Sequence, residues 1–202
     1  FLPALGMAAS LSILVMLQPD AGSALLILAV TFTVLTVAGA RPFHLGMTMV
    51  TVLPLVVTFI ISAGYRRQRL LTFLDPWADP EGAGFQMVQS YLSLAQGGWT
   101  GGGLMQGNAK LHFLPAPHTD FIFAVLGEEL GLLGAITVLA LFGIIFWRAS
   151  RIAVLCKDPF GAYLTAGFTT LLGLQILGNL GVVLGLLPTK GLPLPFFSAG
   201  GS

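Results

Sequence analysis

The sequence predicts an all-α fold, a polytopic transmembrane helical bundle with a long extracytoplasmic loop that carries a short interfacial helix. The chain of 202 residues is 55% hydrophobic and 8% charged, whereas an ordinary soluble domain carries roughly 25% charged residues. Its mean hydropathy is +0.90. Its 26 glycines are typical of helices that pack closely in lipid, where small residues form the contacts. These three observations exclude a water-soluble globular domain.

The charge balance excludes two further classes of protein. Disorder requires low hydrophobicity and high net charge, and the net charge here is +1. Nine Lys and Arg against eight Asp and Glu leave no basic excess with which to neutralise phosphates, so no nucleic-acid partner is expected. The single Cys156 forms no internal disulfide and therefore does not indicate a compartment.

Five stretches are long and apolar enough to cross a membrane, which takes roughly 20 residues in a helix. They cover residues 1–18, 21–40, 45–65, 121–147 and 159–187. The sequence opens in apolar residues without Met and stops in the small-residue run 198–202. We therefore expect residues 1–202 to be a partial membrane domain, a fragment of a larger protein.

Basic residues predict which side of the membrane each connection faces. The two short connections, 41–44 and 148–158, are expected in the cytoplasm because positive charge favours that side. Their basic residues are Arg41, Arg148, Arg151 and Lys157. The long loop 66–118 then lies outside. Three arginines stand at its start against the usual rule, which indicates an anionic binding partner; they are Arg66, Arg67 and Arg69.

The outer loop has internal organisation. Asp-Pro pairs at 75–76 and 79–80 predict turns. Four apolar residues then recur at helical spacing and predict a helix of about twelve residues in the membrane surface. They are Phe85, Val88, Leu92 and Ala95. The glycine-rich run 97–103 is expected to hold no regular structure, and it lacks the ending of a phosphate-binding P-loop.

Charged residues near or inside the spans require a partner or a task, since each costs about 2.5–3.5 kcal/mol at the centre of a span. Asp120 stands at the start of the fourth span, where it either caps the helix or acts as a base. Lys190 is the only charged residue after position 158. It is either an anchor at the interface or a point charge for a phosphate. Asp20 either caps the second span or has a functional role.

Glu128 and Glu129 lie eight and nine residues beyond Asp120, about 12 Å into the fourth span. Adjacent helical residues project about 100° apart, so the two carboxylates cannot point at one partner on one side. We expect structural ion pairs or hydrogen bonds between these glutamates and helices absent from the chain.

Three motifs resemble those of the SEDS family, named for shape, elongation, division and sporulation. They are the run 113–124 with Gly-Glu-Glu-Leu-Gly at 127–131, Leu-Gln-Pro-Asp-Ala-Gly at 17–22, and Leu-Pro-Thr-Lys-Gly-Leu-Pro-Leu-Pro-Phe at 187–196. Family members have ten spans, and this chain resembles spans five to nine. The sequence Thr-Lys-Gly at 189–191 slightly favours the division branch of the family, whereas Gln106 and Gly107 favour the elongation branch. Ala116 and Ala199 depart from the family pattern.

The resemblance implies a peptidoglycan glycosyltransferase that polymerises lipid II outside the cytoplasmic membrane. Asp120 is then the essential residue, acting as the carboxylate general base of an inverting transfer. Thr119, Glu128 and Glu129 support the site structurally. A divalent cation such as Mg²⁺ or Mn²⁺ would assist, although the three scattered histidines and single cysteine form no ligand cluster. The residues expected to bind substrate are Lys190, Arg66, Arg67, Arg69, Lys110, His118 and Asp20.

Two other functions are considered. A lipid II flippase or other transporter needs polar groups along a path through the membrane, whereas most polar groups here gather at the outer edge. A scaffold that only recruits a synthase would make Asp120 dispensable.

The expected location is the bacterial cytoplasmic membrane, with the active site on the extracytoplasmic side. Nothing in the chain is suited to cross-link peptides, so we expect a class B penicillin-binding protein, a transpeptidase, as partner. This partner would also order the flexible run 97–103. The other expected partners are lipid II, a polyprenyl-diphosphate-linked glycan and membrane lipids.

Overall fold

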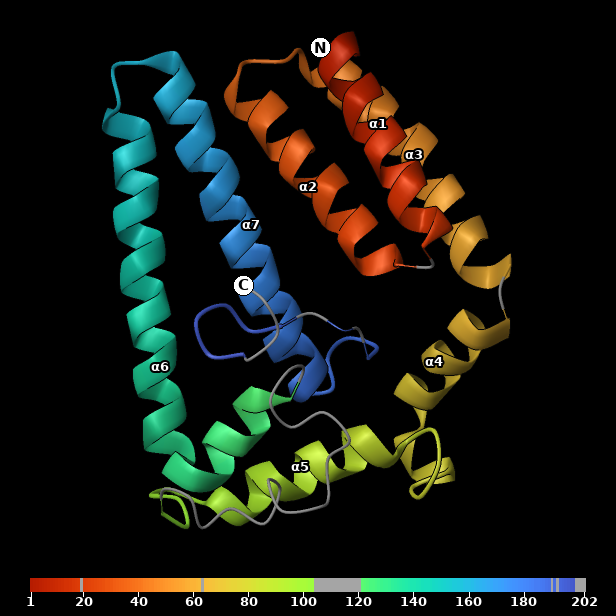
Figure 1. Ribbon diagram of the computed structural model, residues 1–202, viewed down its shortest axis with the longest axis vertical. Helices are drawn as coiled ribbons and strands as arrows, with labels where there is room; N and C mark the ends of the chain where they lie inside the picture. The colour runs from red at the N-terminus through yellow and green to blue at the C-terminus, as the bar shows by residue number, and fades with distance from the viewer. Residues whose placement is uncertain (19, 63, 104–120, 190, 192, 199–202) are drawn as a thin grey trace. The chain divides into compact units, whose positions relative to one another are not determined.

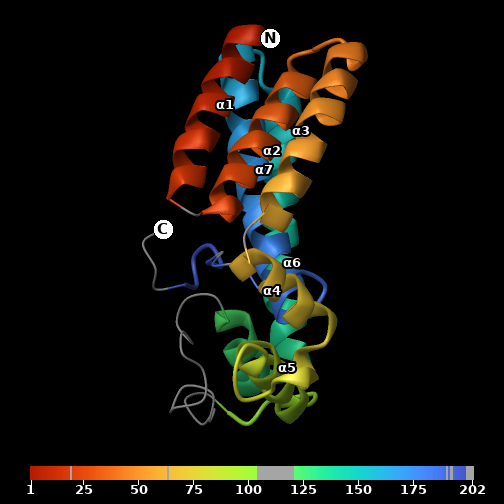
Figure 2. The ribbon, with the colours of Figure 1, turned by 90° about the vertical axis from the view of Figure 1, so that its right-hand side faces the viewer.

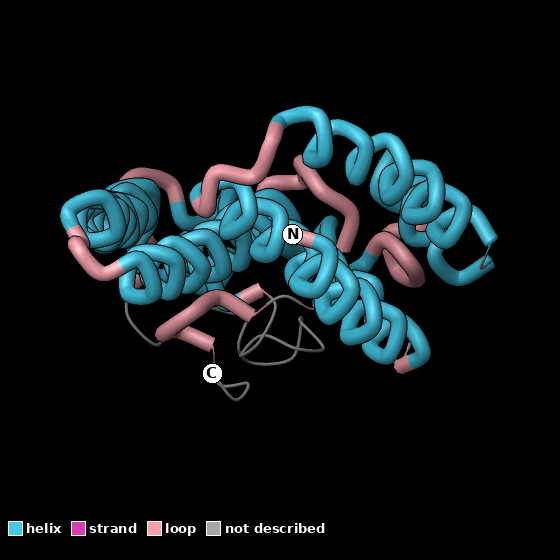
Figure 3. Tube along the Cα trace, turned by 90° about the horizontal axis from the view of Figure 1, so that it is seen from above, coloured by secondary structure: helices cyan, strands magenta, loops and turns pink. Residues whose placement is uncertain are grey.

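The computed structural model describes residues 1–18, 20–62, 64–103, 121–189, 191 and 193–198. These residues are helical or irregular, and Figure 3 draws no strand among them. The all-α prediction is therefore confirmed. The helices are α1 Leu2–Leu17, α2 Ala21–Val37, α3 Pro42–Ser62, α4 Gly64–Leu74, the 3₁₀ helix η1 Pro76–Ala78, α5 Phe85–Gly97, α6 Ile122–Leu155 and α7 Pro159–Val183.

The chain divides into two compact units. Unit 1 comprises residues 1–59 and 144–174, and unit 2 comprises residues 60–143 and 175–202.

In unit 1, helices α1, α2 and α3 run alongside one another in alternating directions (Figures 1 and 2). Small residues allow α1 and α2 to approach closely, since Ala8 and Ala24 are buried at 5% and 0% exposure. The hydroxyl of Ser12 donates a hydrogen bond across this contact to the carbonyl of Ala24 at 3.4 Å. This is the packing that glycine- and alanine-rich helices use in lipid, where apolar burial supplies no driving force between helices.

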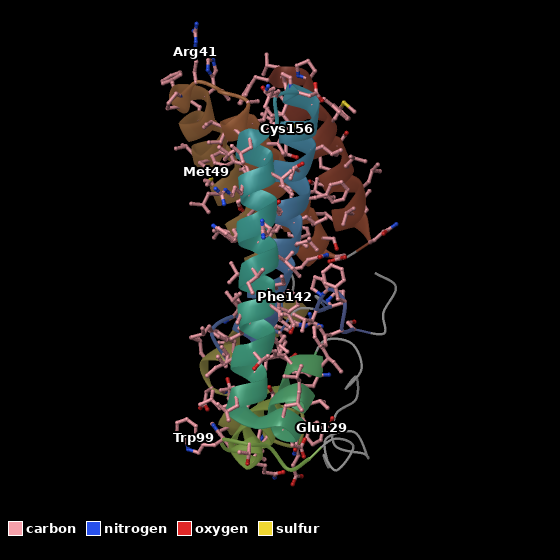
Figure 4. All side chains as sticks on the ribbon, turned by 90° about the vertical axis from the view of Figure 1, so that its left-hand side faces the viewer. Arg41, Met49, Trp99, Glu129, Phe142 and Cys156 are labelled. Carbon is pink, nitrogen blue, oxygen red and sulfur yellow. The ribbon has the colours of Figure 1, made fainter. Side chains whose placement is uncertain are left out.

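The two short connections of unit 1 lie at the same end of that unit, as Figure 1 shows for the turns between α2 and α3 and between α6 and α7. Arg41 and Cys156 mark this end in Figure 4. The placement agrees with the expectation that the two basic connections face the same side of the membrane.

An apolar cavity of about 330 Å³ lies in unit 1 among α1, α2, α3 and the first part of α7. Three threonines line it, Thr33, Thr48 and Thr170. Each hydroxyl donates to the carbonyl four residues earlier, at 3.0, 2.8 and 2.8 Å. Because these hydrogen bonds stay within their own helices, the threonines leave the cavity wall largely apolar.

Unit 2 holds the apolar core of the described residues, which is built from the start of α6, the end of α7 and Leu194. Helix α5 lies against both helices. Met87 and Val88 are buried, and the hydroxyl of Ser90 donates to the carbonyl of Val183 at 3.1 Å. The amphipathic helix predicted from residue 85 is therefore present and covers the core of unit 2.

Three described helices are long and apolar enough to cross a membrane: the part Pro42–Phe59 of α3, α6 and α7. Helices α1 and α2 are apolar but have only 16 and 17 residues, which is slightly short of the roughly 20 residues that a span requires. The part Pro42–Phe59 of α3 has no buried residue. Some of its apolar side chains, such as Val52 and Val56, line the cavity of unit 1. Others, such as Val50 and Leu55, are exposed, as expected for contact with lipid or with further helices.

Two segments differ from the sequence interpretation. The stretch after the third predicted span is the separate helix α4, so the three arginines at its start stand on a helix rather than in a loop. The fourth predicted span continues as α6 to Leu155 and contains a break at Gly131. Hydropathy detects neither feature, because it measures composition along the chain and not backbone direction.

Candidate active site

Helix α6 is interrupted by one residue with non-helical backbone angles. Gly131 has a φ of 67° and a ψ of −167°. Residues other than glycine rarely adopt such a φ. In an unbroken helix the N–H groups of Leu132 and Leu133 would donate to the carbonyls of Glu128 and Glu129. The break at Gly131 separates these partners and leaves a short first helix, 122–130.

The glycine loop, residues 98–103, supplies the partners that the break removes. The N–H groups of Leu132 and Leu133 donate to the carbonyls of Gly98 and Trp99, at 2.9 and 3.2 Å. Figure 4 shows Trp99 and Glu129 at the same end of unit 2.

The exchange is reciprocal. The carbonyls of Glu128 and Glu129 accept from the N–H groups of Gly102 and Gly103, at 3.0 and 3.1 Å. We call the two paired segments, 98–103 and 128–133, the glycine clip. The loop holds no regular structure, as predicted, and four backbone hydrogen bonds within the chain hold it against α6. Further ordering of the loop by a partner protein stays a prediction.

Close backbone approach explains why glycine stands at the clip. A Cβ atom added at Gly97 would overlap the carbonyl oxygen of Gly127, and one added at Gly101 would overlap that of Glu129. A Cβ at Gly131 would overlap the backbone nitrogens of Thr100 and Gly101. The atoms that an added Cβ would overlap belong to the backbone, which cannot shift as easily as a side chain. A substitution at any of these glycines therefore requires the chain to move.

Glu128 and Glu129 are buried by the chain itself, at 5% and 6% exposure, and each has an interaction partner. Burial of these side chains therefore does not require helices from outside the chain. Buried carboxylates persist where they are paired or hydrogen-bonded, which agrees with the structural role expected from the sequence.

The arginines of α4 differ in what they contact. Arg69 donates from its guanidinium group to the carbonyl of Thr189, at 3.2 Å. Arg67 is exposed, and the side chain of Arg66 lies outside the described residues. The structure thus brings α4 to the residue that directly precedes Lys190 in the chain.

Asp20 caps α2 in unit 1. Its Oδ1 accepts from the N–H of Ser23 at 3.0 Å, and its Oδ2 accepts from the hydroxyl of Ser23 at 2.5 Å. The capping interpretation of Asp20 is therefore confirmed, while the functional interpretation stays a prediction.

Five of the predicted site residues lie outside the described part of the chain. They are Lys110, His118, Thr119, Asp120 and Lys190. Among the residues that the structure does describe, no group of three His, Cys, Asp or Glu side chains could hold a metal ion.

The sequence interpretation missed two contacts of unit 2. It treated the glycine run as irregular and did not pair it with the glycines at 127 and 131. It also gave no role to Tyr91, whose hydroxyl occupies the space that a Cβ on Gly185 would need. Burial raises the pKa of the Tyr91 hydroxyl. The available signal for the first contact was the pair of glycine groups, 97–103 and 127 with 131, since glycine permits close approach of two backbones.

The fold and the clip together define a polytopic helical membrane protein in which a glycine-rich loop is held by backbone hydrogen bonds against a broken helix. Residues 1–202 match the family of FtsW, RodA and SpoVE, described as cell cycle protein. The chain belongs to this family, and the resemblance to the SEDS proteins is confirmed.

Curated relatives match over the whole chain. The chain is 48% identical to the "Probable peptidoglycan glycosyltransferase FtsW" of Geobacter metallireducens, of which it covers 54%. It is 42% identical to the stage V sporulation protein E of Bacillus subtilis, of which it covers 55%. The chain therefore spans about half the length of the curated relatives it matches.

Solved structures of similar fold agree with this assignment. One is a peptidoglycan synthase complex that coordinates polymerization and crosslinking, with a TM-score of 0.73 and 33% identity over 98% of this chain and 55% of that one. Another is the rod shape determining protein RodA of Thermus thermophilus, with a TM-score of 0.62 and 26% identity, covering 99% of this chain and 50% of that one.

Proposed function

We propose that the full-length protein is a peptidoglycan glycosyltransferase that polymerises lipid II into glycan strands, in cell division rather than elongation. The observation that carries the proposal is the 48% identity, over the whole chain, to a relative named for this activity. The similarity to sporulation protein E supports the same family chemistry.

The proposed reaction needs one carboxylate. A sugar hydroxyl is a weak nucleophile, so a base within hydrogen-bond reach must take its proton as it attacks the donor. Asp120 is the base we assign, because it matches the essential residue of the family motif. Direct attack inverts the donor carbon and breaks its bond to the diphosphate, so no covalent enzyme intermediate forms.

The leaving group is a polyprenyl diphosphate, which requires positive charge rather than a proton. Lys190 and Lys110 are assigned to it together with Arg66, Arg67 and Arg69. The contact between Arg69 and the carbonyl of Thr189 supports this group, since it links α4 to the chain next to Lys190. His118 is a further substrate contact. A divalent cation such as Mg²⁺ or Mn²⁺ is proposed only as an accessory to the diphosphate.

The proposed location is the bacterial cytoplasmic membrane, with the site on its outer side. The proposed partner is a class B penicillin-binding protein. The similarity to a peptidoglycan synthase complex supports a partner that crosslinks the strands. We expect the purified full-length protein to polymerise slowly alone and faster with this partner, as a titration of the partner would measure.

Asp120→Asn in the full-length protein tests the central assignment. Asparagine caps a helix as well as aspartate does but cannot act as a base, so polymerisation of lipid II should cease while the protein stays folded in detergent. Gel analysis of glycan strands is the measurement. Activity near the wild-type level would remove Asp120 from the role of base. A wild-type protein that moves lipid II across vesicles but never polymerises it would establish the transporter function instead.

The charge assignment has its own test. Lys190→Ala should lower activity more than the triple change of Arg66, Arg67 and Arg69 to Gln, because a single lysine in an otherwise uncharged motif has no substitute. Titration with lipid II measures both. Normal turnover of Lys190→Ala at every substrate concentration would make Lys190 an interfacial anchor.

A further inference from the structure

We propose that the glycine clip is a positioning device for the proposed active site, and that Gly101 and Gly131 are positioning residues within it. The inference rests on the proposed function. The clip joins the glycine loop to α6 where the short helix 122–130 ends. It therefore sets the direction of this short helix, which begins two residues after Asp120 in the chain.

The clip fixes one end of the stretch that contains Asp120. Gly103 is tied to the carbonyl of Glu129, and the stretch 104–120 follows directly. At the other end Phe121 is buried at 2% exposure, and its carbonyl accepts from the N–H groups of Ala124 and Val125 at 3.0 and 3.3 Å. Both ends of the stretch are therefore fastened to the same short helix.

Backbone hydrogen bonds make this attachment more exact than side-chain packing would. The four bonds of the clip join residues about 30 positions apart, so the loop cannot slide along α6 without breaking several of them at once. Packing between apolar side chains tolerates shifts of register more readily. A base must stand within about 0.5 Å of its productive position, and a displacement of about 1 Å can lower the rate roughly a hundredfold.

Gly101 is the most direct point at which to disturb the clip. Its φ is +78°, and a Cβ would overlap the carbonyl oxygen of Glu129, which itself takes part in the clip. Gly102 stands beside it, yet a Cβ there meets its nearest atom, the Glu128 carbonyl oxygen, at 3.9 Å. Gly143, farther along α6, has no atom within 4 Å of an added Cβ.

The test compares Gly101→Ala with Gly102→Ala and Gly143→Ala in the full-length protein, assayed for polymerisation of lipid II. We expect kcat of Gly101→Ala to fall about tenfold to a hundredfold while KM for lipid II stays within about twofold. Gly102→Ala should lose less than Gly101→Ala, and Gly143→Ala should match the wild type. A smaller fraction of folded protein would also lower the apparent kcat without changing KM, so kcat is expressed per folded protein, counted by size-exclusion chromatography in detergent below the thermal unfolding midpoint of each variant.

Gly98→Ala replaces Gly101→Ala if the latter does not fold. It strains the loop through a φ of +52°, but no atom lies within 4 Å of the added Cβ, so a smaller loss of kcat is expected. Hydrogen exchange of the wild type adds a measurement free of substitutions: the N–H groups of Gly102, Gly103, Leu132 and Leu133 should exchange slowly.

Three results would overturn the positioning role. They are equal kcat in Gly101→Ala and Gly143→Ala, a rise of KM with kcat unchanged, and exchange of the four N–H groups at the rate of free loop amides. Failure of the proposed function is distinguishable, because it would appear as a wild-type protein that does not polymerise lipid II or as an active Asp120→Asn variant.

Discussion

Unit 1 and unit 2 use the same apolar composition in different ways. Unit 1 buries few side chains, among them Ala8, Ser12 and Ala24, and directs most of its large apolar residues outward. The hydroxyls of Thr33, Thr48 and Thr170 donate hydrogen bonds to carbonyls of their own helices. Unit 2 buries an apolar core, two glutamates and a loop whose backbone pairs with a broken helix.

The difference indicates where specificity lies in such a chain. In unit 1 the helices satisfy their own backbone hydrogen bonds, as lipid requires, and one side-chain hydrogen bond, from Ser12 to the carbonyl of Ala24, joins α1 to α2. In unit 2 a helix has given up two of its bonds to another segment. Because these backbone hydrogen bonds join one particular pair of segments, unit 2 is the unit suited to hold reacting groups in place.

The largest expected effect is on the free energy of unfolding, when the same substitution, Gly to Ala, is made once in each unit. Gly131→Ala should lower the free energy of unfolding by about 2–5 kcal/mol, the sum of backbone strain and overlap with the glycine loop. Gly46→Ala, in α3 of unit 1, meets no atom within 4 Å and should raise stability by about 0.5–1 kcal/mol. Denaturant titration of both variants in detergent measures the contrast. Equal effects would mean that the clip contributes no more to stability than a lipid-facing helix does.

A smaller effect is expected at the cap of α2. Asp20→Ala removes both hydrogen bonds to Ser23 and should cost about 0.5–2 kcal/mol, whereas Asp20→Asn should restore most of the loss. The measurement is the unfolding midpoint of each variant together with polymerisation by the full-length protein. An Asp20→Asn variant with normal stability and no activity would establish the substrate-binding role and would place a functional side chain in unit 1.

The smallest effect concerns the pH dependence of unit 2. Burial raises the pKa of Tyr91 above its ordinary value of 10.0, so the folded state holds the phenol proton more tightly than the unfolded state. This contribution is complete below the unfolded pKa and declines as the pH rises above it. The unfolding midpoint should fall less for Tyr91→Phe than for the wild type between about pH 8 and about pH 11. Parallel declines would show that Tyr91 is equally solvated in both states.

Much of the fold was predictable because hydropathy and helical spacing report burial directly. The ranges 1–18 and 21–40 enclose α1 and α2, and the spacing from Phe85 marks the start of α5. The capping role of Asp20 was predictable from its position before an apolar run.

The clip was not predictable, because it is made of backbone groups. Every residue carries the same N–H and C=O, so no side chain marks which amide of the glycine loop pairs with which carbonyl of α6. The glycines marked only that close approach was sterically allowed. The helix α4 was missed because hydropathy marks the end of the apolar span at residue 65 and does not report that the polar residues after it are helical, although arginine has high helix propensity.

The pairing across the break in α6 also has a consequence for the order of events during synthesis. Residues 98–103 leave the ribosome before residues 128–133 exist, and at about 5–20 residues per second the interval is roughly 2–6 s. During that time the amides of the loop lack the carbonyls with which they pair in the folded protein. The pairing can form only after residues 128–133 have been added, so the loop is complete before the direction of α6 at Gly131 is set.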